Sequence, residues 1–71
     1  MSERPEKHSL TLRGHRTSVS MEAAFWDAFR KLALQRGQSV NALAAEIDQS
    51  RAAEVGLASA IRVFVLKSLT G

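Results

Sequence analysis

The 71-residue sequence predicts a mostly α-helical fold with one short β-strand. Apolar and polar residues alternate between residues 9 and 20, which is the pattern of a strand with one buried face. From residue 21 onward, apolar residues recur every three or four positions, which is the pattern of amphipathic helices. The chain has no cysteine, and 45% of its residues are apolar. A single domain of this size is marginally stable alone, so we expect a homodimer.

Three segments are expected along the chain. Residues 1–8 are polar, include the only proline and are expected to form a flexible arm. Residues 9–50 are expected to form the core of the domain, and residues 51–71 a C-terminal helical extension.

The best strand candidate lies at residues 16–20. A lone strand leaves its backbone N–H and C=O groups unpaired, so this strand needs a partner. Gly14 leaves two alternatives open. It can form a tight turn with His15 that makes a hairpin, or it can mark a bulge or bend in one longer strand.

A first helix is expected from about residue 21 to residue 36. Ser20 can cap its start, and Gly37 can end it in the left-handed conformation that a helix stop favours. One face carries the apolar residues of a core, which are Met21, Phe25, Ala28, Phe29 and Leu32. A second face, with Trp26, Arg30 and Leu34, is expected to receive the C-terminal helix, either of the same chain or of the partner chain.

Two further helices are expected. Ser39 can cap a helix from Val40 to about Gln49, and its inward residues are Val40, Leu43, Ala44 and Ile47. A last helix lies within residues 51–69, after a break at Gly56. It is apolar nearly all round, so we expect it to be buried on most sides.

Charge and composition restrict the function. The net charge is +3, and residues 9–20 hold Arg13 and Arg16 without an acid, which favours a polyanion as partner. No signal peptide or membrane span is visible, so a cytoplasmic location is expected. The sequence has no arrangement of nucleophile, base and acid, so no enzyme is expected. His8 and His15 lack a third ligand in register, so neither a metal nor a cofactor is expected.

Several residues carry a resemblance to a known family. They are the strand residues 16–21, the stripe of Phe25, Phe29 and Leu32, the link at residues 36–39, and the start of the second helix at residues 41–43. In this order they resemble the ribbon-helix-helix DNA-binding family of the Arc and MetJ type. The run from Gly14 to Ser20 resembles one small bacterial subgroup of it.

The resemblance implies an intertwined homodimer, in which two chains pair their strands into an antiparallel ribbon that enters the DNA major groove. The outward residues Arg16, Ser18 and Ser20 would contact bases, because arginine can donate two hydrogen bonds to guanine and serine can bond several bases. The residues expected at DNA phosphates are Arg13, Ser39, Val40 and Asn41. Thr17 would face inward beside the expected dimer core, which is Val19, Met21, Phe25, Phe29, Leu32, Leu43 and Ile47.

The expected function is that of a homodimeric transcriptional regulator that binds double-stranded DNA. Whether dimers assemble into tetramers stays open. The alternative is the same dimer acting as a protein-interaction module, antitoxin-like or adaptor, with weak or no specific DNA binding. In that alternative the apolar residues of the segment 51–71 would hold a protein partner.

Overall fold

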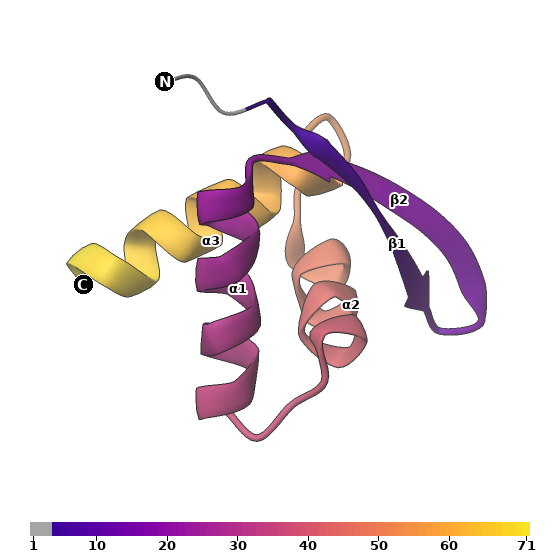
Figure 1. Cartoon of the computed structure of the whole chain (residues 1–71). Helices are drawn as coiled ribbons and strands as arrows, with labels where there is room; N and C mark the ends of the chain where they lie inside the picture. Colours follow the sequence, from indigo (N-terminus) through magenta and orange to yellow (C-terminus); the bar gives the residue numbers. More distant parts are fainter. Residues whose placement is uncertain (1–3) are drawn as a thin grey trace.

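The computed structural model describes residues 4–71 as a two-stranded antiparallel ribbon packed on helices (Figure 1). The elements in chain order are β1 (Glu6–Leu12), β2 (His15–Met21), α1 (Ala23–Gln35), α2 (Val40–Ser50) and α3 (Leu57–Thr70). This architecture confirms the predicted fold class, including the C-terminal third helix. No helix within the described residues is both long and apolar enough to cross a membrane.

The ribbon differs from the prediction in one respect, because the chain supplies two strands rather than one. β1 pairs with β2 in an antiparallel register that places Leu12 opposite His15 and Glu6 opposite Met21. Arg13 and Gly14 form the two-residue turn, with φ values of 53° and 86°. Positive φ at both positions is typical of the type I′ turn, whose twist matches that of a hairpin. Of the two alternatives that Gly14 left open, the hairpin is the one observed, although its turn consists of Arg13 and Gly14, and His15 already belongs to β2.

β1 also changes the expected segments. Residues 6–8 belong to this strand rather than to a flexible arm, and residues 1–3 of that arm lie outside the described residues. β1 was not predicted as a separate strand because only its second half carries aliphatic side chains. Leu10 and Leu12 are buried, whereas the inward residue before them is His8. The ring of His8 stacks on Trp26 of α1, with 4.0 Å between ring centroids.

The first helix begins later than predicted. α1 starts at Ala23, because Ser20 and Met21 continue β2, so the prediction of Ser20 as N-cap is wrong. Glu22 occupies the cap position and makes no side-chain hydrogen bond to the helix. The helix ends as predicted at Gly37, whose φ is 68°.

Two hydrogen bonds close the C-terminus of α1. The Gly37 N–H donates to the carbonyl of Leu34 at 3.0 Å, and the Gln38 N–H donates to the carbonyl of Ala33 at 2.9 Å. This pair is the Schellman motif, which satisfies the last carbonyls of a helix and turns the chain sharply. Ser39 then caps α2 as predicted, since its hydroxyl accepts the Ala42 N–H at 3.0 Å.

A single core joins all five elements. The inner face of the hairpin and the three helices each contribute to it; its buried residues are Leu10, Leu12, Val19, Met21, Phe29, Ala33, Leu43, Ala44, Ile47, Ile61 and Val65. Ile61 and Val65 of α3 are 0% and 1% exposed, so α3 belongs to this core and is not a separate appendage.

Within one chain, α3 does not pack on the face of α1 that was expected to receive it. It lies against the face of α1 that holds Phe25, Ala28 and Leu32, rather than against the face of Trp26 and Leu34. The face of Trp26 receives His8 of β1 instead, and Leu34 is 78% exposed. The hairpin thus covers Trp26, on the face of α1 where α3 was expected.

Candidate nucleic-acid interface

The outer face of the hairpin is a polar surface backed by the core. Because side chains alternate across a strand, the residues opposite to the buried ones point away from the helices. The cross-strand pairs on this face are Lys7 with Ser20, Ser9 with Ser18, and Thr11 with Arg16. We call these six residues the outer ribbon face. All of them are exposed, two are cationic and none is acidic.

The structure brings together the residues predicted to contact bases. Arg16, Ser18 and Ser20 lie on one side of β2, while Val19 and Met21 are buried on the other side. Thr17 also points inward by register, but it remains exposed near the turn. The face is wider than predicted, because β1 adds Lys7, Ser9 and Thr11. Ser9 and Thr11 lie within the alternating segment of residues 9–20, whereas Lys7 fell in the segment that was expected to be a flexible arm.

Arg13 lies at the tip of the ribbon, in the turn. Its guanidinium donates a hydrogen bond of 2.5 Å to the side-chain oxygen of Gln49, near the end of α2. The cation predicted at a phosphate is therefore exposed at the end of the outer ribbon face, and it is anchored to the helix below.

The start of α2 adjoins the edge of the ribbon. The side-chain oxygen of Asn41 accepts the backbone N–H of Thr11 at 3.0 Å, so β1 and α2 are joined directly. The N–H groups of Val40 and Asn41 are among those that a helix start leaves without a partner inside the helix. Together with the positive end of the helix dipole, such groups attract anions.

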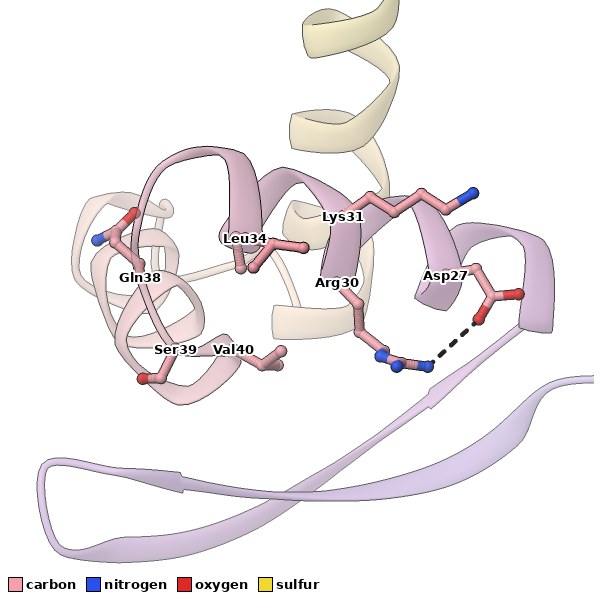
Figure 2. A pocket seen from close by; sticks show the side chains of 8 residues that line it. Asp27, Arg30, Lys31, Leu34, Gln38, Ser39 and Val40 are labelled. Atoms are coloured by element: carbon pink, nitrogen blue, oxygen red, sulfur yellow. Dashed lines mark ion pairs between the residues drawn. The ribbon is translucent and has the colours of Figure 1, made fainter.

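Arg30 is a cation at this helix start that the sequence did not reveal. It lines a shallow pocket of about 380 Å³ that also contains Ser39 and Val40. Figure 2 shows its guanidinium pointing toward the hairpin, where it forms an ion pair of 3.7 Å with Asp27, whereas Lys31 points the other way. Residues 37–50 contain no lysine or arginine. The positive charge beside the start of α2 therefore comes from Arg30 of α1.

Arg62 of α3 holds the junction between the ribbon and α1. Its Nε and Nη2 atoms both lie 2.9 Å from Glu22 Oε1, and Nη2 also donates to the Ser20 carbonyl at 3.1 Å. The guanidinium stands over the ring of Phe25, with 6.0 Å to the centroid. The hydrogen bond from Arg62 lowers the pKa of the Glu22 carboxyl below its usual range. This contact fixes the end of β2 with respect to the helices.

The residues predicted as a dimer core lie inside one chain. Val19, Met21, Phe29, Leu43 and Ile47 are buried, and Phe25 and Leu32 are partly buried against them. Phe25 and Leu32 keep some exposed surface in the single chain.

Comparison with known proteins agrees with this geometry. The family model of the ribbon-helix-helix domain matches residues 5–69, which include the hairpin and all three helices of the described chain. Searches of curated proteins and of solved structures gave no match. Proteins with this domain are generally DNA-binding and resemble transcription regulators, and they form dimers. Since the match covers most of its length, the chain belongs to the ribbon-helix-helix domain family.

Proposed function

We propose that this protein is a homodimeric transcriptional regulator that binds double-stranded DNA by inserting its hairpin into the major groove. The observation that carries the proposal is the outer ribbon face, on which two cations and four hydroxyl groups stand without an acid. The buried inner face of the same hairpin rests on the core, so the outer face is a rigid surface rather than a loop.

The dimensions of the ribbon suit the major groove. Paired strands lie about 4.8 Å apart, and the groove of B-DNA is about 12 Å wide, so two strands with their side chains fit into it. A strand of seven residues, such as β2, spans roughly 23 Å at about 3.3 Å per residue. A strand of that length extends over several base pairs. The three cross-strand pairs of the outer ribbon face would then lie at successive positions along the groove.

The side chains on this face would have different roles in recognising DNA. Arg16 can donate two hydrogen bonds to guanine O6 and N7, and it is the residue best suited to specify a base. Ser18 and Ser20, with Ser9 and Thr11 opposite or beside them, can donate to or accept from several bases, so they discriminate less. Lys7 and Arg13 stand at the two ends of the ribbon, where they would meet the phosphate backbone.

The start of α2 provides a second anchor in this proposal. Asn41 holds it beside Thr11, so a ribbon in the groove brings the helix start toward the flanking backbone. There the N–H groups of Val40 and Asn41, the Ser39 hydroxyl and the Arg30 guanidinium would bind one phosphate. These contacts position the protein, whereas the ribbon reads the sequence.

Replacement of Arg16 by alanine tests the proposal. We expect the affinity for DNA to fall by about tenfold or more, because each bidentate contact to guanine contributes about 1–3 kcal/mol. Lys31→Ala is the matched control, because it removes one positive charge whose side chain points away from the hairpin (Figure 2). Equal loss in the two variants would show that net charge, rather than the ribbon, determines binding.

A selection of bound fragments from a random duplex library tests whether binding is sequence-specific. Enrichment of one repeated motif supports a regulator with defined operators. Without an enriched motif, the alternative gains support, in which the protein is an interaction module whose partner is another protein. The exposed apolar side chains of α3, Leu66 and Leu69, favour that second candidate.

A further inference from the structure

Arg16 has no side-chain partner that would hold it in place. It is exposed, and within residues 4–71 its guanidinium makes no hydrogen bond or ion pair. His15 and Thr17, its neighbours in β2, are exposed as well. The place of the Arg16 side chain on the outer ribbon face is therefore set by the backbone of the ribbon.

Thr11 of β1 is the residue that lies opposite Arg16 in the ribbon. Its backbone N–H donates to the side-chain oxygen of Asn41 at 3.0 Å, so this N–H points out of the hairpin rather than toward β2. Antiparallel residues of this type face each other without mutual backbone hydrogen bonds, and their Cα atoms lie about 4.5 Å apart, the closer of the two spacings. Because the flanking pairs join the two strands, the backbone of Arg16 follows that of Thr11.

The side chain of Asn41 is used for the ribbon rather than for its own helix. Asn41 is the second residue of α2 and is exposed. Asparagine forms helices less well than alanine, so helix stability does not account for this residue. It does not cap the helix either, because the Ser39 hydroxyl accepts the Ala42 N–H. Its side chain instead accepts the N–H of Thr11, which lies 30 positions away in the chain.

α2 gives Asn41 a fixed position beside β1 (Figure 1). The inward residues of the helix, Leu43, Ala44 and Ile47, are buried in the same core as the hairpin. Near the other end of the helix, Gln49 accepts a hydrogen bond from Arg13 of the turn. α2 is thus bound to the ribbon at both ends, and Asn41 binds it at the pair that carries Arg16.

We infer that Asn41 is a positioning residue for Arg16, through the hydrogen bond that its side chain accepts from Thr11. This inference rests on the proposed function, in which Arg16 contacts a base, and deepens it by adding a residue that determines specificity. The role of the side chain is separate from that of the Asn41 backbone N–H, which the proposed function places at a phosphate. The other edge of the two-stranded sheet, that of β2, takes no part in this contact and stays available for pairing with a second chain.

Hydrogen exchange of the Thr11 amide, measured by NMR without DNA, tests the contact itself. Asn41→Ala should accelerate this exchange by about fivefold or more, since a hydrogen bond shifts an equilibrium by about that factor. Asn41→Asp is the matched variant, because its carboxylate can still accept the Thr11 N–H, and exchange should stay slow. Circular dichroism should show both variants folded, because position 41 is exposed and Ser39 still caps α2.

Binding to two duplexes tests the effect on base recognition. The first is the duplex that the wild-type chain enriches from a random library, and the second differs from it at one guanine. Arg16→Ala identifies this guanine, because that variant no longer distinguishes the two duplexes. Asn41→Ala should lower the affinity for the first duplex more than that for the second, so that their ratio falls by about threefold or more. Asn41→Asp should keep the ratio and bind both duplexes more weakly, because its charge repels both.

Faster exchange at Thr11 together with a lower ratio, in Asn41→Ala and not in Asn41→Asp, supports the inference. Unchanged exchange in Asn41→Ala would overturn it. So would an equal loss of affinity for both duplexes, since a uniform loss is typical of a direct phosphate contact. A wild-type chain that prefers no duplex would contradict the proposed function and this role with it, and that failure is recognised before any change at position 41.

Discussion

The guanidinium of Arg62 lies 2.9 Å from the carboxylate of Glu22 and also binds the Ser20 carbonyl, so one side chain of α3 joins the end of β2 to the start of α1. Both side chains are about 30% exposed. The two residues are 40 positions apart in the chain. The contact therefore makes the orientation of the ribbon depend on the last helix.

Acid should weaken this contact. Folding lowers the pKa of Glu22, mainly through the hydrogen bond from Arg62, so the folded chain binds this proton more weakly than the unfolded chain. The stability that the pair contributes is complete above the ordinary pKa of glutamate, roughly 4.3, and is lost as the pH falls through the lowered value. Urea unfolding at a series of pH values measures this loss. In Glu22→Gln that part of the pH dependence should disappear, while Glu54→Gln, at an exposed position, should retain it.

Removal of a buried side chain from α3 should destabilise the whole domain. Ile61 is 0% exposed, and Ile61→Ala should lower the free energy of unfolding by about 2–5 kcal/mol. Thermal unfolding monitored by circular dichroism gives the change. Leu34→Ala, at a position that is 78% exposed, should stay within about 0.5 kcal/mol of the wild type. A small effect of Ile61→Ala would mean that α3 is an independent extension rather than part of the core.

The residue at the turn should affect stability and DNA binding in opposite directions. Arg13 adopts a φ of 53°, a conformation that costs most L-residues about 1–2 kcal/mol and that asparagine tolerates better. Arg13→Asn should therefore stabilise the hairpin by up to about 1 kcal/mol, even though the hydrogen bond to Gln49 is lost. The affinity for DNA should fall, because a cation leaves the tip of the ribbon. A binding assay beside a thermal melt separates the two effects.

Lys7 provides a test of the strand that was missed in the sequence. If β1 forms half of the reading surface, Lys7→Ala should weaken binding to all duplexes to a similar degree. It should also reduce the slope of log affinity against log salt concentration by about one. Titrations at several salt concentrations measure both. An unchanged slope would place β1 outside the interface.

The sequence predicted much of this structure where local signals were strong. The period-two pattern correctly assigned Val19 and Met21 to the inner face and Arg16, Ser18 and Ser20 to the outer face of β2. Gly37 and Ser39 marked the link between α1 and α2, since a helix stop and a cap each require few residue types. These features depend on backbone geometry within a few residues.

The errors arose where the answer depends on residues far apart in the sequence. Trp26 and Phe25 both lie on α1, and nothing local determines which of them meets α3. The stacking of His8 on Trp26 decides it, because it places β1 over that face. Arg30 was missed as a neighbour of the α2 start for the same reason, since only the fold brings it to Val40.

The two-residue turn between β1 and β2 has a consequence for how fast the ribbon forms. A hairpin closed by so short a loop forms in about 1–10 μs in a single chain. A ribbon built from two chains forms only when the chains associate, so its rate of formation falls as the protein concentration falls. In this protein the hairpin is closed within one chain, so the rate at which it forms does not depend on the concentration of the protein, whereas formation of the proposed homodimer does.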